Sequence, residues 1–430
     1  MATHYLNKSI SKTWEIDQGG DVWVLGEDGR ITGTNFTGIR ASSLISTATI
    51  RVDGDILLIG WTPGLDIHAG AVTITVGKKA HIDADVAIHH SNEFGSVSIY
   101  NRGWLEGNFG ISAFASQGGA AIRNSGTIDA VDGGICLGGA GATIVNSGKI
   151  EAANGIFVAS GNGDTDPLNA ANATRIVNEG DIVCVTDGDV IGAGFSIQAQ
   201  NVAVHITNTG LLGGTVLLGD GDDVLLSMLG TVQGNIIAGG GNDVVNMRGS
   251  HYTGSIFGGD GDDIVTLASA DAGYVENDHA GTDLVRVDAS YALGLHVENM
   301  VLLGAGNHTG AGNSLDNWLR GNCGVNSLFG MDGDDRLDGR TAHDTLTGGA
   351  GADCFVFKCG YGSDTIMDFT DGSDRIDLSG FTGIDDFGDL AGKIAEKGDN
   401  LVIAFNDTDR LVLKNAAADG AELSAADFIF

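Results

Sequence analysis

Apolar and polar residues alternate along many short stretches of this chain, and small turns rich in Asn, Ser and Gly separate the stretches. Residues 71–76 read Ala-Val-Thr-Ile-Thr-Val, and residues 143–148 read Thr-Ile-Val-Asn-Ser-Gly. A period of two residues is typical of a β-strand with one buried face. The pattern therefore predicts short, half-buried strands joined by tight turns.

The strands recur at an interval that fits one turn of a solenoid. The apolar residue that opens the strand after each turn falls at Ile31, Ile56, Ile82, Leu105, Ile128, Ile150, Ile182 and Leu212. A unit of roughly 20–30 residues cannot bury its apolar edge alone, so it must stack on its neighbours. The two longest intervals, before Ile182 and Leu212, indicate surface loops. We predict an all-β fold that begins with a right-handed parallel β-helix over residues 1–215, in which 1–70 form either true rungs or an N-terminal cap.

Acidic corners recur every 20 residues in the next part of the chain, at Asp223, Asp243, Asp263 and Asp283. A fixed interval over whole rungs places these side chains on one flank of the solenoid, ~4.8 Å apart. Carboxylates at that separation repel one another unless a cation lies between them. We therefore predict that residues 216–300 form calcium-bearing rungs.

A nine-residue repeat follows these rungs. Large apolar residues recur in steps of nine at Leu319, Leu328, Leu337, Leu346 and Phe355, and an Asn or Asp precedes each by two places. Residues 348–356 match Gly-Gly-x-Gly-x-Asp-x-U-x, with U a large apolar residue, which is a calcium-binding nonapeptide of parallel β-structures. Glycine permits positive φ, so backbone carbonyls can face an ion that takes six to eight oxygen ligands. We predict a β-roll over residues 301–360 and a C-terminal β cap over 361–430.

The candidate calcium ligands and turn glycines all lie in these repeats. They are Gly219, Asp220, Gly221, Asp222, Asp223, Gly239, Gly241, Asn242, Asp243, Gly259, Asp260, Gly261, Asp262, Asp263, Asp283, Gly330, Asp332, Gly333, Asp334, Asp335, Gly339, Asp344, Gly348, Gly349, Gly351 and Asp353. Asn317, Asn326 and the loop at 340–343 depart from the motif, so we expect weak or empty sites there.

The C-terminal half resembles the repeats-in-toxin (RTX) family, and residues 297–430 are particularly similar to the C-terminal domain of serralysin-type proteins. The resemblance rests on residues 297–304, the nonapeptides, 364–369 and 427–430. It implies Gram-negative type I export from the cytoplasm to the medium, with the secretion apparatus as a transient partner. Residues 427–430 fit the uncleaved C-terminal signal of such export, and residues 1–10 lack the apolar segment of a secretory leader.

Composition and charge exclude several other classes of protein. The 70 Gly and 2 Pro residues exclude collagen, and a hydrophobic share of 42% is too high for a disordered chain. The net charge of −34 argues against nucleic acid or anionic lipid as a partner and favours cations. No window is apolar enough to span a membrane. Such charge also opposes compaction, so the folded state requires neutralisation.

The five cysteines are scattered and show no C-x-x-C spacing. We expect them to be small buried residues, and a disulfide between Cys354 and Cys359 stays open as an alternative. Cysteine is uncommon in chains that resemble this family, so its presence is a departure from the pattern.

Sequence motifs of common enzymes are missing. No His is followed by Glu, as H-E-x-x-H requires, and no Ser has Gly at both −2 and +2. The enzyme class left open is a polysaccharide lyase or uronan epimerase on the β-helix. Its weak candidates are Asp83, Asp85 and His89, with His90 beside them, because paired carboxylates near a His can abstract a proton from a sugar ring.

The sequence thus favours a secreted, calcium-dependent β-solenoid without enzymatic activity, in an adhesin-like or matrix role at a cell surface or polysaccharide. Segment 216–360 is expected to stay extended at low cytosolic calcium and to fold outside the cell, where calcium is abundant. The lyase or epimerase remains the alternative, and calcium scavenging or surface-layer assembly forms a third class.

Overall fold

The computed structural model describes residues 2–92, 95–114, 119–139, 141–159, 173–185, 194–267, 269–270, 273–278 and 281–430. Apart from the short 3-10 helices η2 (Phe387–Leu390) and η3 (Ala425–Asp427), these residues form strands and turns. The chain divides into two units, Met1–Gly259 and Asp260–Phe430, which are described in turn.

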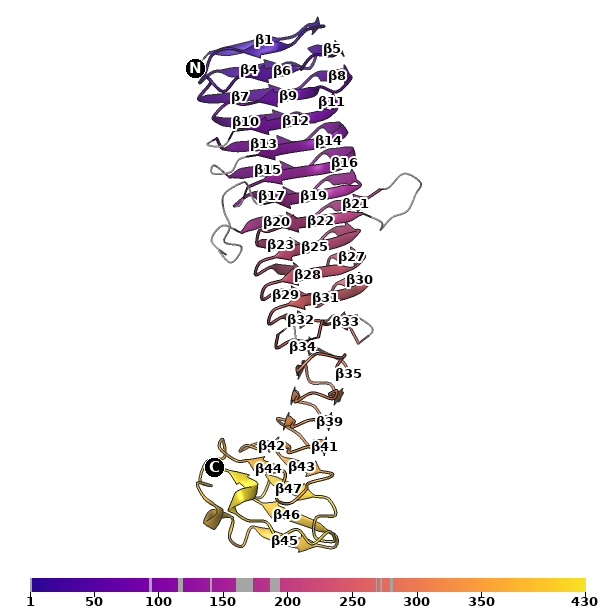
Figure 1. The fold of residues 1–430 in the computed structure, drawn as a ribbon. Helices are drawn as coiled ribbons and strands as arrows, with labels where there is room; N and C mark the ends of the chain where they lie inside the picture. Colours follow the sequence, from indigo (N-terminus) through magenta and orange to yellow (C-terminus); the bar gives the residue numbers. More distant parts are fainter. Residues whose placement is uncertain are drawn as a thin grey trace. The chain divides into compact units, whose positions relative to one another are not determined.

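The first unit is a parallel β-helix with three faces, and its strands stack as successive turns (Figure 1). The first face contains β1 (Thr3–Leu6), β4 (Val22–Leu25), β7 (Thr47–Val52), β10 (Ala71–Val76), β13 (Val97–Asn101), β15 (Ala120–Asn124), β17 (Thr143–Asn146), β20 (Thr174–Asn178), β23 (Val204–Asn208), β26 (Val224–Ser227) and β29 (Val244–Asn246).

The second and third faces are joined because two long strands run along both. The second face contains β2 (Ser9–Ile10), β5 (Arg30–Thr34), β8 (Asp55–Ile59), β11 (His81–Asp83), β14 (Trp104–Phe114), β16 (Thr127–Gly138), β18 (Lys149–Ala152), β21 (Asp181–Cys184), β24 (Leu211–Gly213), β27 (Thr231–Gln233) and β30 (His251–Thr253). The third face contains β3 (Trp14–Ile16), β6 (Ile39–Ala41), β9 (Pro63–Ile67), β12 (Val86–Ser91), β19 (Asn154–Ala159), β22 (Phe195–Gln200), β25 (Thr215–Asp220), β28 (Ile236–Gly240) and β31 (Ser255–Asp260), with the second halves of β14 and β16.

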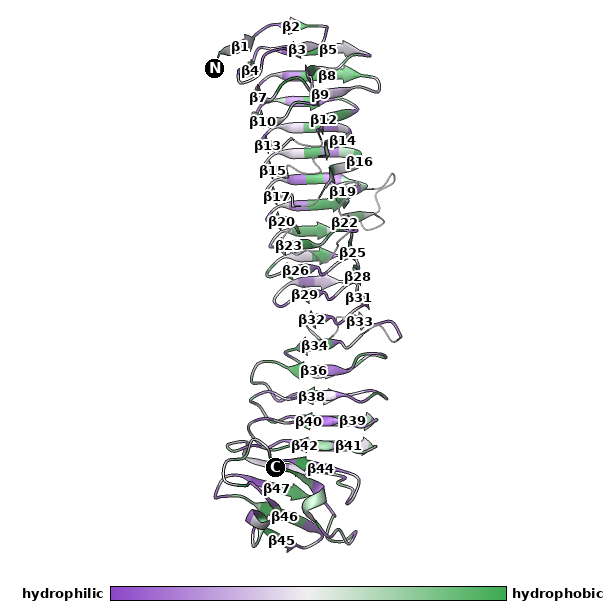
Figure 2. Ribbon diagram, turned by 60° about the vertical axis from the view of Figure 1, so that its left-hand side comes forward, coloured by the Kyte–Doolittle hydropathy of each residue, from purple (hydrophilic) through white to green (hydrophobic). Residues whose placement is uncertain are grey.

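The apolar marker residues identified in the sequence form the core of this unit. Ile56 pairs with Ile82, Ile82 with Leu105, and Leu105 with Ile128, and the same register continues to Leu212. All of these side chains are fully buried. Figure 2 shows hydrophobic and hydrophilic positions mixed along the strands, as the period of two requires. The predicted parallel β-solenoid is confirmed.

A ladder of buried asparagines runs along one corner of the first unit. Asn101, Asn124, Asn146, Asn178 and Asn208 lie in register, and each Nδ2 donates to the Oδ1 of the next, over 2.8–2.9 Å. The last amide donates to Oγ of Ser227. Because a buried amide must pair its polar atoms, the ladder fixes the register of the turns at this corner.

The second unit is a β-roll with two parallel faces. One face contains β32 (Ile264–Thr266), β34 (Leu284–Val287), β36 (Asn299–Leu302), β38 (Trp318–Arg320), β40 (Arg336–Asp338), β42 (Cys354–Val356), β44 (Arg375–Asp377) and β48 (Phe428–Ile429). The other contains β35 (Tyr291–Ala292), β37 (Thr309–Ala311), β39 (Ser327–Asp332), β41 (Thr345–Ala350), β43 (Ser363–Ile366) and β47 (Arg410–Leu413). The short strand β33 (Gly273–Val275) precedes this second set.

The nine-residue repeat produces this two-faced roll because two repeats make one turn. Leu319 pairs with Leu337 and Leu337 with Phe355 on one face, while Leu328 pairs with Leu346 on the other. All five side chains are buried. The inward side chains of the two faces therefore form a single narrow core.

An antiparallel meander closes the end of the roll. β45 (Ile394–Lys397) pairs with β46 (Asn400–Ala404), and β46 pairs with β47. The rings of Phe357, Phe381 and Phe405 stack beneath it, with centroids 4.5–6.1 Å apart. The predicted C-terminal β cap forms, and it covers an edge that would otherwise expose unpaired strands.

The expectation for the cysteines is wrong for most of them. All five are free thiols, so Cys354 and Cys359 form no disulfide, and Cys184 alone is fully buried. Cys323 and Cys359 are exposed because they lie in turns rather than on the inner side of a strand. Among the described residues, no helix is long and apolar enough to cross a membrane.

Asn146→Ala is expected to lower the free energy of unfolding by about 1–3 kcal/mol, because it removes the side-chain donor to the buried Oδ1 of Asn178 and the side-chain acceptor of Nδ2 of Asn124. Urea denaturation at saturating calcium measures this change. Ser147→Ala, which removes only a weak bond of 3.4 Å in the same turn, is the control and is expected to change it by less than about 0.5 kcal/mol. Equal effects of the two variants would contradict the role of the ladder.

Candidate metal centre

Two carboxylates stand at the same corner of successive turns in the first unit. Asp223 precedes β26 and Asp243 precedes β29, and these strands pair in parallel. The amide N–H of Asp223 donates to Oδ1 of Asp243 over 2.8 Å, and that of Val204 donates to Oδ1 of Asp223 over 2.6 Å. Both side chains are buried. One oxygen of each carboxylate thus anchors the turn before it.

The second unit carries two further rows built on the same bond. In the first row, the amides of Asn317, Asp335 and Asp353 donate to Oδ1 of Asp335, Asp353 and Asp374 in turn, over 2.8–3.0 Å. In the second row, Asn326 donates to Asp344 and Asp344 to Asp364, over 2.7–2.9 Å. The rows lie at the start of the strands of opposite faces, so alternate nonapeptides contribute to alternate rows.

The second oxygen of these carboxylates takes no part in the hydrogen bonds between turns. Among the described residues, the buried Oδ2 atoms of six aspartates have no hydrogen-bond partner: Asp223, Asp283, Asp335, Asp344, Asp353 and Asp364. A buried carboxylate oxygen without a partner is costly, and its recurrence at equivalent positions of the repeat indicates a ligand rather than a packing error.

Glycines lie directly against these oxygens. A Cβ atom on Gly330 would lie 2.1 Å from Oδ2 of Asp335, and one on Gly348 would lie 2.1 Å from Oδ2 of Asp353. Gly339 stands in the same relation to Asp344, at 2.6 Å. A side chain at these three positions would therefore collide with the carboxylate, so glycine is what lets each aspartate oxygen occupy its place in the turn.

This donor set fits calcium. Calcium is a hard cation that takes carboxylate and backbone carbonyl oxygens. The rows offer buried carboxylate oxygens beside turns in which Gly333, Gly349 and Gly351 have φ of +115°, +112° and +143°. Such φ values disfavour most other residues, although Met331, the register partner of Gly349, adopts φ of +93° and Ala342 adopts +112° in the same roll.

Residues 189–429, more than half of the chain, match the family model described as peptidase M10 serralysin C terminal. The chain belongs to this family. The match contains every predicted calcium ligand and leaves residues 1–188 outside. The predicted resemblance to the serralysin-type C-terminal domain is confirmed.

Solved structures add local similarity only. The extracellular lipase LipA from Serratia marcescens is 17% identical, with a TM-score of 0.27, and the match covers 60% of this chain and 45% of the lipase. The AlgE6R3 subunit of the Azotobacter vinelandii mannuronan C5-epimerase is 27% identical, with a TM-score of 0.23, and the match covers 32% of this chain and 81% of that subunit. This chain thus matches less than half of the lipase's length. No curated protein matches the chain.

The structure separates the predicted ligands of the serralysin C-terminal module into an inner and an outer set. The residues at the key position of each repeat form the buried rows. The remaining acidic and amide residues of the motif are exposed or half-buried: Asp220, Asp222, Asn242, Asp260, Asp262, Asp332 and Asp334. Some of these form an outer ladder, since the amide of Asn242 donates to Asp222 and that of Ala352 to Asp334.

Several members of the rows come from outside the motif. Asp263, Glu276 and Asp283 form a buried cluster whose carboxylate oxygens lie within 4.8 Å of one another, and Oε2 of Glu298 accepts the amide of Asp283. Periodicity could not reveal Glu276 or Glu298, because neither follows the repeat. Asp364 and Asp374 extend the rows of the roll at intervals of 20 and 21 residues, where inserted residues break the step of nine.

Asn317 and Asn326 end the rows of the roll on one side. Nδ2 of Asn317 donates to the carbonyls of Val297 and Glu298, and Nδ2 of Asn326 donates to Oδ1 of Asn322. At these positions the amide nitrogen makes protein contacts in place of the second carboxylate oxygen. That weak or empty sites occur here stays a prediction.

The weak catalytic candidates do not come together. Asp83 ends β11 and Asp85 lies in the bend that follows, and both line a groove on the β-helix. His89 lies on β12, and its Nδ1 is 2.9 Å from Oδ1 of Asp66, away from the groove lining. His90 is buried, and desolvation lowers its pKa to about 4. The expected grouping of His89 with the two carboxylates is therefore wrong, because β11 and β12 belong to different faces.

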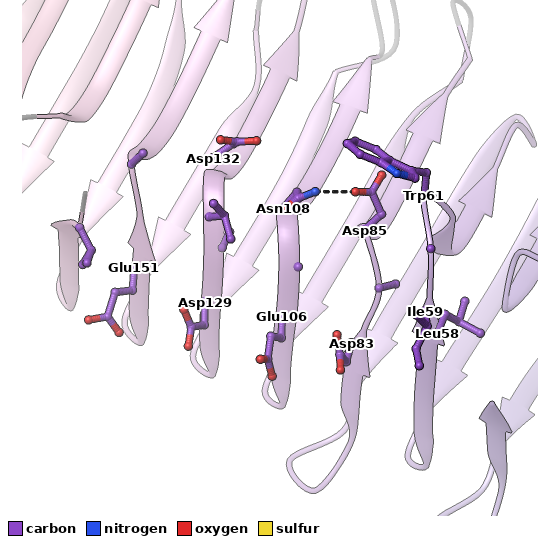
Figure 3. A pocket seen from close by; sticks show the side chains of 17 residues that line it. Leu58, Ile59, Trp61, Asp83, Asp85, Glu106, Asn108, Asp129, Asp132 and Glu151 are labelled. Carbon is purple, nitrogen blue, oxygen red and sulfur yellow. Dashed lines mark hydrogen bonds between the residues drawn. The ribbon is translucent and has the colours of Figure 1, made fainter. Parts of the chain in front are cut away.

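The groove itself has a volume of about 1040 Å³ and follows several turns of the β-helix. Figure 3 shows Asp83, Glu106, Asp129 and Glu151 in a row on successive strands, with the exposed ring of Trp61 nearby. Burial, with the charge of Glu106, raises the pKa of Asp83, and burial with Glu151 raises the pKa of Asp129. The described lining contains no Lys or Arg.

Burial also dominates the electrostatics of the rows of buried aspartates. It raises the pKa of Asp223 to about 9, those of Asp283, Asp335 and Asp344 to about 7, that of Asp353 to about 6 and that of Asp364 to about 8. Neighbouring carboxylates add to the shift at most of these positions. Without a cation, the folded rows therefore bind protons more tightly than the unfolded chain, where a carboxyl has a pKa near 3.8.

Without calcium, the roll is expected to be more stable at pH 5 than at pH 8. Stability from a raised carboxyl pKa is fully present below the unfolded pKa of 3.8 and is lost as the pH rises through the folded values of about 6–8. Far-UV circular dichroism in chelator measures the change, which we expect as a higher strand content at pH 5 than at pH 8.

At saturating calcium the roll is instead expected to be more stable at pH 8 than at pH 5, because protons then compete with the ion for the same oxygens. The same pH dependence with and without calcium would contradict ion binding by the rows.

Proposed function

We propose that this protein is an extracellular calcium-binding solenoid that folds completely only when calcium fills its acidic rows. The observation that supports this most directly is the set of six buried aspartates whose second carboxylate oxygen lacks a hydrogen-bond partner among the described residues. The serralysin C-terminal family and the net charge of −34 support it as well.

The rows suggest which residues would hold the ions. Asp335 and Asp353 would serve the first row of the roll, and Asp344 and Asp364 the second. Calcium supplies the positive charge that these rows lack. Oδ1 of each of these aspartates holds the previous turn, and the buried Oδ2, which has no hydrogen-bond partner, would bind the ion.

The free energy involved is large enough to control folding. Extracellular calcium modules have dissociation constants of about 10⁻⁴–10⁻³ M. At a tenfold excess of calcium over such a constant, each ion adds about 1.4 kcal/mol to the stability of the folded state. Several ions together therefore contribute an amount comparable with the total stability of a domain, about 5–15 kcal/mol.

An extracellular setting follows from the same reasoning. In the low calcium of a cytosol the rows keep their repulsion and the roll stays extended, a form suited to export through the type I route that the family resemblance implies. Outside, the folded chain would present the long surface of its β-helix to a cell surface or matrix. We therefore place its function in adhesion or matrix structure rather than in catalysis.

Removal of calcium is expected to unfold the roll and to lower the strand content in far-UV circular dichroism. Asp335→Asn is expected to raise the calcium concentration at the folding midpoint, because an amide keeps the anchor to Asn317 but replaces Oδ2 and its charge. The control is Asp407→Asn, which makes the same change of charge at an exposed position of the same unit.

Two results would contradict the proposal. One is equal strand content with calcium and with chelator. The other is an equal shift of the midpoint in Asp335→Asn and Asp407→Asn, which would reduce the effect of calcium to general charge screening.

A second candidate function, a polysaccharide lyase or epimerase, is favoured by the groove. Asp83 and Asp129 have raised pKa values there, as a general acid requires, and the cavity is long enough for an extended chain. The row of carboxylates without a cationic residue in the described lining opposes a uronate substrate, so we rank binding above catalysis.

Incubation with alginate or pectin, followed by ultraviolet absorbance of unsaturated products and by analysis of uronate composition, tests this ranking. We expect no turnover by the calcium-saturated protein. Asp132 lines the same groove and serves as the control. Turnover that is lost in Asp83→Asn but kept in Asp132→Asn would place catalysis above binding.

A further inference from the structure

Three metal-ligating side chains meet on the third face of the β-helix, outside the calcium rows. Asp66 lies on β9 and pairs in register with His89 on β12, and His68 follows β9 on the same side. Oδ1 of Asp66 is 2.9 Å from Nε2 of His68 and 2.9 Å from Nδ1 of His89. One ligand atom from each residue lies within 4.8 Å of the other two.

Neighbouring residues hold these side chains in place. Oγ of Ser91 is 2.8 Å from Nδ1 of His68, which leaves Nε2 directed at Asp66. Nδ2 of Asn92 donates to the backbone carbonyl of His68 over 2.8 Å. Nε of Arg40 lies 3.6 Å from Oδ2 of Asp66, so the other carboxylate oxygen faces the histidines. Bonds of this kind to ligating groups fix ring orientation and tautomer in metal sites.

The donor chemistry differs from that of the calcium rows. Two imidazole nitrogens and one carboxylate oxygen suit Zn²⁺ and its first-row neighbours, whereas calcium prefers oxygen alone. We propose that Asp66, His68 and His89 form a transition-metal site, with Zn²⁺ as the ion to test. The side chains are 16%, 38% and 29% exposed, so an ion reaches them from solvent and keeps room for a water ligand.

The other histidine–carboxylate pairs in the described part of the chain lack this convergence. His4 pairs with Asp21 over 3.0 Å and His81 with Glu106 over 2.9 Å, each with a single imidazole. Among the described residues, the triad of Asp66, His68 and His89 is the only group of at least three convergent ligands that contains nitrogen. This feature distinguishes the triad from an ordinary surface ion pair.

Zinc titration of the full chain by isothermal calorimetry tests the site. The protein is kept in excess calcium so that the acidic rows are filled, and it carries Cys323→Ser and Cys359→Ser so that the two exposed thiols cannot bind the ion. We expect one equivalent of Zn²⁺ per chain. His68→Asn and His89→Asn are each expected to weaken binding at least tenfold, and Ser91→Ala about tenfold through loss of orientation.

His81→Asn is the matched control, since it removes a histidine–carboxylate pair from a neighbouring face, and it is expected to leave zinc binding unchanged. Cobalt(II) absorbance gives a second readout, with ligand-field bands that disappear in His68→Asn and persist in His81→Asn. Circular dichroism checks whether each variant is folded. If a histidine variant does not fold, the zinc affinity of Ser91→Ala tests the site in its place. Absence of zinc binding, or an equal loss in His81→Asn, would overturn the proposal.

Discussion

Buried carboxylates stacked turn upon turn are the constraint on which the rest of this structure depends. Each aspartate of a row uses one oxygen to accept the backbone amide of the preceding turn, and this bond sets the register of the roll. The other oxygen brings charge into a place that water does not reach, as at Asp335 and Asp353. Because burial of unpaired charge is costly, we expect the same residues that align the turns to oppose their closure in the absence of a cation.

The turns of the β-helix that carry the asparagine ladder also bury polar side chains, but these side chains are uncharged. At the end of each strand of the first face, Asn124 and Asn146 pair their side-chain amides with one another along the ladder, whereas Asp335 and Asp353 precede their strands and accept backbone amides. An asparagine can donate and accept, so a column of them satisfies itself, whereas a column of carboxylates can only accept. This difference explains why one part of the chain is expected to fold without calcium and the other is not.

Much of the fold could be predicted from the sequence, because apolar period, repeat length and glycine position all report the same stacked geometry. Ile82 and Leu105, for example, pair as their spacing predicts. What could not be predicted lies outside the repeat. Glu276 joins the carboxylates only through the path of a non-repeating loop. Nearness in sequence groups His89 with Asp83, yet a change of face between β11 and β12 separates them and brings His89 to Asp66 on the neighbouring turn instead.

Hydrogen–deuterium exchange of the full chain, with calcium and with chelator, tests the central claim most directly. The amides that donate within the rows, such as those of Asn317, Asp335 and Asp344, are expected to be protected with calcium and to exchange rapidly without it. Amides of the asparagine-bearing turns are expected to stay protected in both conditions. Equal protection of the row amides with and without calcium would contradict the claim that the ion closes the roll.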